Sequence, residues 1–542
     1  TRKRSSAASD VYKRQPFNGS FKVRGYNMAT NPDIVPFLPE EVGHRLQQFA
    51  GSSLMAESGD VPISPTAVVD ANVTLWRGPP TPDGPAELDF RGSLSFTNGT
   101  AAYEVFPYPF RNMAGSVQFD RTRIRIEEIR GVSHTGATIS ASGLIEPIGP
   151  TASVNLQIDT VNVPVDDVLE EALGETRGGI IDELFDDRRY AQLVERGLIL
   201  TPERAEELRE QRDRLELELA KAERDGAGGA RIEQIRAQLS STKSQLRTPV
   251  FAYRGKADLG IRLRREEGEV SHWSRHIEVR LPEAGVVLKD FPLPIRARDV
   301  VVVLTEESAS LLRGSYRPIG GGAAMLTGTA ALRTPEGEAA FRPALRVQAD
   351  RVPVGDLLRF AIGPPEVEDE DPGVSADRRV ASELVERLGV NGTFAADGLV
   401  LTRPNGKLGF DLEITPDNVV LASEPMRDRA PMLVGDLVGK LRVTEQGMSL
   451  NAEARAYGVD DDESLESPVD VRVEADVDWS GDDGLKYEAN IEADGAFFQL
   501  PAEQVVGAIS DAGGESLVWL RDTFNPTCLL YTSDAADDLF RV

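Results

Sequence analysis

A pair of histidines is the first feature of this sequence that could do chemistry. His272 and His276 are four residues apart, a spacing at which two imidazoles can share one helical face and ligate a metal. Their segment, EVSHWSRHIEVRL, instead runs into alternating apolar and polar residues, and it has no HExxH arrangement. We therefore predict structural or surface positions for both. His134 lies in GVSHTG, which predicts an exposed turn.

Other segments lack the full spacing of a catalytic or nucleotide-binding signature. The acidic runs 366–371 and 460–463 do not have the alternating ligands, central glycine and final glutamate of a calcium loop, so solvated loops are predicted, with weak divalent-ion binding as the alternative. Gly320–Gly322 is not followed by Lys-Ser/Thr, which favours a turn between strands over a phosphate loop. G-x-S-x-G is absent from the sequence. We predict no enzymatic activity, catalytic residue, cofactor or metal.

The two ends of the chain resemble each other in an unusual way. Ser5–Gln15 reads SSAASDVYKRQ and Cys528–Asp538 reads CLLYTSDAADD. Both resemble translations of one sequencing-library adapter, read from its opposite strands. We expect residues 1–15 and 528–542 to be adapter-derived, and 16–527 to be an internal fragment of a longer protein. Cys528 is the single cysteine, so disulfides and thiolate chemistry are excluded for 16–527.

The chain is strongly acidic. Its formal net charge is −28, and it becomes −30 without the two terminal segments, which carry +4 and −2. Nucleic acid is therefore a poor partner, because its affinity comes largely from Lys and Arg on phosphates. No run reaches the roughly 18–20 apolar residues of a spanning helix.

Internal repeats organise the sequence. LQIDTVNVPVDDVL (156–169) aligns without gaps with LRVQADRVPVGDLL (345–358), and a weaker third copy covers 493–509. An F-P-x-P element precedes each of the first two copies, at 106–109 and 291–294. Paired prolines remove backbone donors, so we favour a strand end there over a ligand site. Val-Pro-Val-x-Asp predicts a strand end and then a short helix, with Asp167 and Asp356 as N-caps.

Between these landmarks the apolar residues alternate with polar ones. Examples are Leu94 with Phe96, Leu412 with Ile414, and Val471 with Val473, while Asn98-Gly99 indicates a turn. Such alternation predicts half-buried antiparallel strands with one apolar and one polar face. The fold class is therefore mainly β, a curved, groove-like sheet of repeating antiparallel strands with short capping helices.

Residues 202–246 break the two-residue period. Leu208, Leu215 and Leu219, and then Ile232, Ile235 and Leu239, recur at helical spacing on either side of a Gly-rich turn at 226–229. Thr201 and Pro202 suit the start of the first helix. We predict an antiparallel helical hairpin. It is either an insertion that packs on itself or on the sheet, or a docking arm for a protein partner or a second copy.

These features divide the chain as follows: β-repeat unit 1 at 16–170, a helical insertion at 171–248, β-repeat unit 2 at 249–364, an acidic linker at 365–380, and β-repeat unit 3 at 381–527.

Strand-rich repeats punctuated by F-P-x-P and V-P-V-x-D resemble the AsmA-like superfamily. GSVQFDRTRIRIEEIRGVSHTGATISASGLIE (115–146) is similar to its repeating unit, as is GDLVGKLRVTEQGMSLNAEARAYG (435–458). The resemblance covers roughly 17–170 and 251–509, and the helical hairpin departs from it. It implies a periplasmic envelope protein, anchored in the inner membrane by an N-terminal helix outside this chain, whose apolar groove carries acyl chains of phospholipids between membranes during outer-membrane assembly.

The predicted groove-lining residues are Phe96, Val117, Phe119, Ile124, Ile126 and Ile139. Alternation leaves open whether this face is a groove or a packed core, and a one-residue slip in register would reverse it. The first alternative function is an envelope scaffold that binds proteins through the hairpin. A groove open at both ends favours lipid transfer, and a plugged groove favours the scaffold. A carbohydrate-active or adhesive protein is the second alternative, disfavoured by an aromatic content of 6%.

Overall fold

The computed structural model describes fourteen stretches of the chain. They are residues 17–26, 66–78, 88–103, 106–148, 151–268, 273–289, 291–334, 337–365, 390–402, 408–421, 432–444, 446–458, 469–478 and 486–494. Both adapter-like ends, His44, His272, the acidic runs and most of the third repeat copy lie outside these residues.

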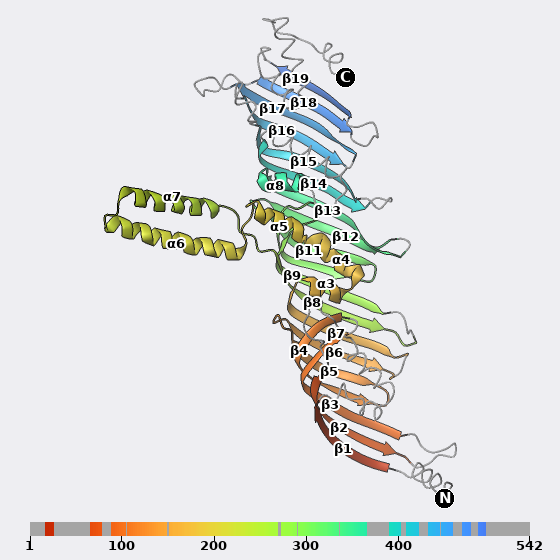
Figure 1. Cartoon of the computed structure of the whole chain (residues 1–542). Helices are drawn as coiled ribbons and strands as arrows, with labels where there is room; N and C mark the ends of the chain where they lie inside the picture. Colours follow the sequence, from red (N-terminus) through yellow and green to blue (C-terminus); the bar gives the residue numbers. More distant parts are fainter. Residues whose placement is uncertain are drawn as a thin grey trace, which may run out of the picture.

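Nineteen strands form one antiparallel sheet, and each strand pairs with the next one in the sequence (Figure 1). The mainly β fold predicted from alternation is confirmed. Within the described residues β1 pairs with β2 and β19 pairs with β18, so the sheet is open at both ends. The strands are β1 (Phe17–Tyr26), β2 (Thr66–Arg77), β3 (Leu88–Tyr103), β4 (Phe106–Asp120), β5 (Ile124–Val132), β6 (Thr138–Glu146), β7 (Ser153–Pro164), β8 (Arg254–Arg265), β9 (Ser274–Val286), β10 (Ile295–Leu304), β11 (Ser308–Pro318), β12 (Ala323–Arg333), β13 (Ala339–Pro353), β14 (Val390–Thr402), β15 (Leu408–Leu421), β16 (Met432–Thr444), β17 (Gly447–Gly458), β18 (Val469–Asp478) and β19 (Lys486–Asp494).

Six helices in the described part of the chain interrupt the strand succession at two points. Between β7 and β8 lie α3 (Asp167–Leu173), α4 (Glu175–Leu184), α5 (Asp187–Glu195), α6 (Pro202–Arg224) and α7 (Gly229–Gln245). Helix α8 (Asp356–Ile362) follows β13. The sheet is continuous across both insertions, because Leu156 of β7 pairs with Leu263 of β8 and Leu345 of β13 pairs with Val400 of β14.

The predicted helical hairpin is confirmed as α6 and α7. Thr201 caps α6 by accepting a hydrogen bond from the backbone N–H of Arg204, and Pro202 occupies the first turn. The hairpin packs on itself through Leu215, Ala222, Ile235 and Leu239, and it projects away from the sheet (Figure 1).

The two repeat copies adopt the same local structure. Each Val-Pro-Val element ends a strand, β7 or β13, and leads into a short helix, α3 or α8. The F-P-x-P element at 106–109 forms the first four residues of β4, and the one at 291–294 lies immediately before β10. Both are positions at a strand end, where missing proline donors are tolerated. Gly320–Gly322 forms the predicted turn, between β11 and β12.

The predicted helix caps were wrong by one residue. Asp166, not Asp167, caps α3, because its carboxylate accepts the N–H of Leu169 at 3.0 Å. The N-cap of α8 is Gly355, without a side-chain bond, and Asp356 is the first helical residue. Both aspartates at the first helical position still place negative charge at a helix N-terminus, where the dipole favours it.

The predicted turn at Asn98-Gly99 was also wrong. Asn98 has φ +54° inside β3, where the register to β4 shifts between Phe96 and Gly99. The pair is therefore a β-bulge. Asn162, Asp299, Arg351 and Asp436 are left-handed residues at similar register shifts in β7, β10, β13 and β16. Bulges bend a strand and increase its twist, so their recurrence helps to curve the sheet.

One face of the sheet is apolar along its length. Residues directly opposite in an antiparallel ladder share a face, so the register can be followed from strand to strand. Val69 pairs with Phe96, Leu94 with Val117, Val117 with Ile126, and Ile145 with Val154. The same face continues through Leu156 and Leu263, Leu345 and Val400, Leu412 and Val443, and Ala452 and Val473. We call this the inner face.

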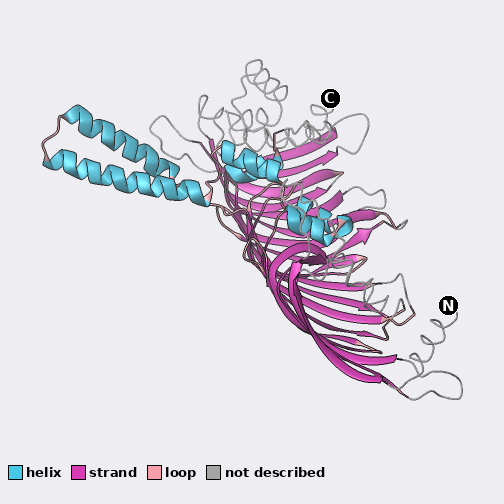
Figure 2. Cartoon of the chain, turned by 60° about the horizontal axis from the view of Figure 1, so that its bottom comes forward, coloured by secondary structure: helices cyan, strands magenta, loops and turns pink. Residues whose placement is uncertain are grey.

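The sheet curves toward the inner face and forms a trough (Figure 2). A Cβ added to Gly143 would lie 2.5 Å from the carbonyl oxygen of Asn155, and one added to Gly398 would lie 2.1 Å from that of Asp411. Both glycines are on the inner face, so the neighbouring strand tilts over them. Glycine at such positions lets a sheet bend sharply.

We predict that Gly398→Ala will destabilise the sheet locally by about 1–3 kcal/mol, the usual range for overpacking. Hydrogen exchange of the β14 and β15 amides measures this loss. The matched control is Gly229→Ala at the start of α7, where an added Cβ has nothing within 4 Å. Unchanged exchange in β14 and β15 of the Gly398→Ala protein would show that the close approach is not required for the bend.

Candidate functional site

All six predicted groove residues lie on the inner face. Phe96 belongs to β3, Val117 and Phe119 to β4, Ile124 and Ile126 to β5, and Ile139 to β6. The cross-strand pairs Leu94–Val117, Val117–Ile126 and Ile126–Gly143 all lie on one face of β3 to β6. Ile139 lies four residues before Gly143 in β6 and therefore shares that face. Their side chains are half-buried. The structure therefore brings these six residues together on one apolar surface that retains contact with solvent.

A second half-buried stretch of the inner face was not assigned to the site from the sequence. It runs from β13 to β18, and among its described inward residues none is ionisable. The alternation in these strands could have found it. Its members include Val347, Phe394, Val400, Phe410, Leu412, Ile414, Leu441, Val443, Leu450, Val471 and Val473.

The outer face of the same strands carries cross-strand ion pairs. Arg442 bonds Asp411 at 2.7 Å, Arg346 bonds Asp397 at 3.0 Å, and Arg472 bonds Glu453 at 2.8 Å. The hydrogen bond from the Arg346 side chain lowers the pKa of Asp397. Exposed pairs contribute little to stability. Their consistent placement nevertheless fixes which face meets water, because a one-residue slip would bury them.

The middle of the inner face, from β7 to β12, is covered. Leu169 and Leu173 of α3, and Ile181 and Phe185 at the end of α4, are buried against Leu156, Ile158 and Ile261 and their neighbours. Burying four large apolar side chains contributes about 6–12 kcal/mol, at about 1.5–3 kcal/mol each. This stretch is a packed core, so the question left open by alternation has different answers along the sheet. Burial there also raises the pKa of Tyr316 on β11 to about 12.

Helices α3 and α4 bridge the trough from wall to wall. Helix α3 contacts β4, and α4 contacts β12 and β13. Nine strand spacings separate β4 from β13, an arc of roughly 43 Å at about 4.8 Å per spacing. Two helices of 7 and 10 residues are only about 26 Å long together. They can reach both walls only because the sheet is curved. We call α3 and α4 the plug.

The plug and α5 are fastened to one rim of the trough. Arg254, at the start of β8, donates to Asp167 of α3 at 3.1 Å and to Asp187 of α5 at 2.9 Å. Its guanidinium also lies 5.8 Å from the centre of the Tyr253 ring. That ring stacks on Tyr190 of α5 at 4.1 Å. Phe185 forms a backbone bridge to Val287, and the N–H of Asp186 donates to the Val287 carbonyl at 3.0 Å.

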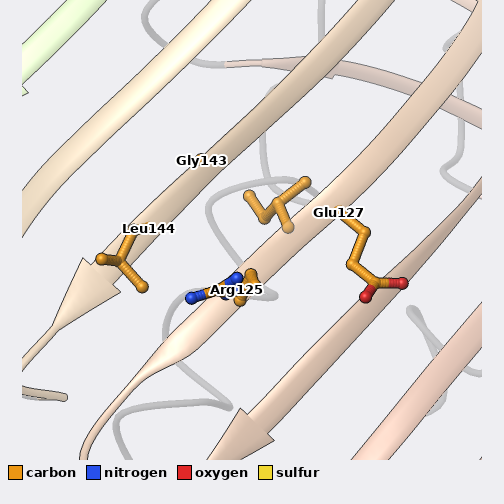
Figure 3. Close-up of a pocket in the computed structure, with 5 residues that line it drawn as sticks. Arg125, Glu127, Gly143 and Leu144 are labelled. Carbon is orange, nitrogen blue, oxygen red and sulfur yellow. The ribbon is translucent and has the colours of Figure 1, made fainter.

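A shallow depression lies where β5 meets β6 (Figure 3). Arg125 pairs with Leu144 and Ile126 pairs with Gly143 across the ladder. Arg125, Glu127 and Leu144 belong to the outer face, and Gly143 leaves the strand without a side chain beside Ile126. The carboxylate of Glu127 accepts hydrogen bonds from Ser116 and Gln118. The depression is therefore lined by outer-face side chains and by the backbone at Gly143.

The histidines that the structure describes are placed as predicted. His276 lies on β9 opposite Arg262, and His134 is exposed in a turn before β6. Within the described stretches no three His, Cys, Asp or Glu side chains are grouped as metal ligands. In the same stretches no helix has the length and apolarity needed to cross a membrane.

Comparison of the chain with family models, with curated proteins and with solved structures finds no match.

Sequence reasoning found one part of the inner face but missed its division. Leu169 and Leu173, which are four residues apart, form an apolar face of α3, and both are buried. Nothing in that pattern shows that the helix folds back over β7 to β12 or that α4 reaches β13. Those contacts depend on the curvature of the sheet, to which the left-handed residues at bulges and the inward-facing glycines contribute.

Glu170 of α3 offers a pH test of the plug. Burial, together with the negative charges of Asp182 and Asp167, raises the pKa of Glu170 above its ordinary value of 4.5, while Arg254 opposes the shift. A carboxyl whose pKa is raised by folding stabilises the fold below its unfolded pKa and loses that contribution as pH rises through the folded pKa.

We therefore predict that Glu170→Gln raises the thermal unfolding midpoint of the protein at pH 7, with the gain disappearing below about pH 4.5. Melting curves across this pH range measure it. Glu171→Gln on the exposed side of α3 is the control. A gain at pH 4 equal to that at pH 7 would contradict the assigned cause.

Proposed function

We propose that this protein is a non-enzymatic envelope protein that binds acyl chains of lipids along the inner face of its sheet. The observation that carries the proposal is the strand-to-strand register, which keeps an apolar strip on one face from β2 to β18. Sixteen strand spacings give that strip a length of roughly 77 Å at about 4.8 Å per spacing. This exceeds the roughly 30 Å hydrocarbon core of a bilayer.

The side chains at the two ends of the strip are partly exposed, which supports the binding of a ligand there rather than a closed protein core. Half-buried Phe, Ile, Leu and Val side chains line β2–β6 and β13–β18. Large contiguous apolar surfaces on a soluble protein mark interaction sites. An acyl chain needs only apolar contact and gains about 0.8 kcal/mol for each buried methylene. With a net charge of −28, the chain repels anionic head groups. We therefore expect the apolar tails of a lipid, rather than an anionic head group, to bind the protein.

The resemblance of the repeats to AsmA-like proteins supports the setting of this activity. On that basis we propose a periplasmic location, an inner-membrane anchor outside this chain, and a role in lipid transport or outer-membrane assembly. The ligands are proposed to be phospholipids, which meet the inner face through their acyl chains.

Lipids that co-purify with residues 16–527 test the proposal. We expect mass spectrometry of the protein, isolated in mild detergent, to recover phospholipid above the level found with an unrelated acidic protein of similar size. Recovery equal to that control would count against lipid binding.

A matched pair of substitutions assigns the binding to the inner face. Ile414 points inward from β15, and the next residue, Thr415, points outward and is exposed. We predict that Ile414→Glu lowers lipid binding at β13–β18 roughly tenfold, because loss of contact with two methylenes costs about 1.6 kcal/mol and about 1.4 kcal/mol is tenfold. Thr415→Glu leaves it unchanged. Fluorescent fatty-acid titration measures both, and equal affinities would argue against this face.

The second candidate function is a scaffold that binds a protein partner through α6 and α7. The projection of this hairpin from the sheet favours it (Figure 1). Its helices are held together by ion pairs such as Arg236–Glu223 at 2.8 Å and Lys243–Glu216 at 2.9 Å. Leu217 on its surface is 74% exposed.

The base of the hairpin allows a clean deletion. Leu200 and Val250 form a backbone bridge, and the N–H of Leu200 donates to the Pro249 carbonyl at 2.9 Å. We predict that replacing 202–248 by a short glycine linker leaves the circular dichroism of the sheet and its lipid binding unchanged. Loss of a protein partner from pull-downs with lipid binding intact would support the scaffold role, and loss of lipid binding would show that the hairpin belongs to the lipid site.

A further inference from the structure

The inner face changes character twice along the sheet. Its side chains are mostly half-buried in β2–β6, although Tyr108 and Phe110 at the beginning of β4 belong to the buried central cluster; they are largely buried in β7–β12, and mostly half-buried again in β13–β18. Ile126 and Ile414 represent the two end stretches, and Ile261, which is 1% exposed, represents the centre. The change coincides with the cover provided by the plug.

The plug covers the middle of the inner face. Its contacts run from β4 at one wall to β12 and β13 at the other. Leu169 and Phe185 are buried in the same apolar cluster as Ile261 of β8 and Ala330 of β12. An acyl chain lying on the inner face of β2–β6 therefore meets protein side chains, not open apolar surface, when it reaches β7.

Several independent attachments hold the plug. The N–H of Val165, just before α3, donates to the Gly255 carbonyl at 3.0 Å. At the other end of the plug, the N–H of Lys289 donates to the Glu183 carbonyl and its ammonium pairs with the Glu183 carboxylate, both at 3.2 Å. Arg254 joins α3 to β8 between them. Release would break these bonds and expose the buried side chains of α3 and α4 together.

We infer that the inner face is divided into two separate acyl-chain sites, one on β2–β6 and one on β13–β18, with the plug as a fixed partition between them. This inference rests on the proposed lipid binding. It departs from a single continuous conduit, in which a chain would slide along the whole sheet. Acyl chains are the chosen occupant because the described inward side chains of β13–β18 include no ionisable group with which a peptide or sugar could pair.

Site-specific photo-cross-linking tests the partition. A residue bearing an aliphatic diazirine replaces Phe96, Val400 or Ile261 in otherwise unchanged protein of the full chain. Each protein is mixed with dioleoylphosphatidylcholine vesicles that carry a radiolabelled trace of the same lipid, and is then illuminated. We expect lipid adducts from positions 96 and 400, and at least tenfold less adduct from position 261.

Two further variants test independence. Ile126→Glu should lower the adduct at position 96 about tenfold and leave the adduct at position 400 within twofold, and Ile414→Glu should do the reverse. Leu169→Ala with Leu173→Ala removes apolar contact from the plug, and it should raise the adduct at position 261 several-fold in protein that retains its circular dichroism. If this double variant does not fold, the partition is still tested by comparing the adducts at positions 96, 261 and 400 in protein with an unsubstituted plug.

The outcomes separate this inference from the proposed function. No adduct at positions 96 and 400 would overturn lipid binding itself. Comparable adducts at 96, 261 and 400 with the plug unsubstituted would keep lipid binding and overturn the partition. Loss of the adduct at 400 on Ile126→Glu would likewise show one connected site.

Discussion

The pairing register is the constraint on which this structure depends. Each of the nineteen strands bonds the next one in sequence, so a single slip would turn every later apolar residue toward water. Two devices hold the register. Cross-strand pairs such as Arg442–Asp411 mark the outer face, and inward glycines such as Gly398 accept a neighbouring backbone that no side chain could accommodate. Because both devices recur along the sheet, an apolar strip continues on the inner face from β2 to β18, with Arg265 and Arg275 near strand ends on the same face.

The curvature of the sheet gives the inner face its two roles. Bulges at Asn162, Asp299 and Arg351 bend the strands, and the bent sheet brings β4 and β13 close enough for two short helices to span them. Where the helices reach both walls, the inner face becomes an ordinary core. Where they do not, Phe96 and Ile414 remain half-buried. The proposed lipid sites and the core that stabilises the fold are thus parts of one surface.

The helical insertion separates two tasks that its sequence alone does not distinguish. Helices α3 to α5 pack onto the trough and its rim, whereas α6 and α7 leave the sheet and pack on each other. The difference follows from composition. Leu169, Leu173 and Phe185 face the large apolar cluster on the sheet, while the exposed sides of α6 and α7 are mostly polar or charged. The two proposed functions, lipid binding and partner binding, therefore belong to separate elements.

Local sequence pattern determined the strands, the hairpin, the repeat landmarks and the shared face of Phe96, Val117, Phe119, Ile124, Ile126 and Ile139, because alternation and helical spacing act between near neighbours. Even locally, it missed the bulge at Asn98, since a left-handed Asn suits both turns and bulges. It also placed two caps one residue late: adjacent aspartates compete for the cap of α3, and α8 begins after Gly355, which has no capping side chain. Only the tertiary structure decided which part of the apolar face is covered. Coverage depends on the curvature accumulated over the ten strands from β4 to β13. It also depends on the contact between α3 and β4, which lie too far apart in the sequence for a local pattern to predict.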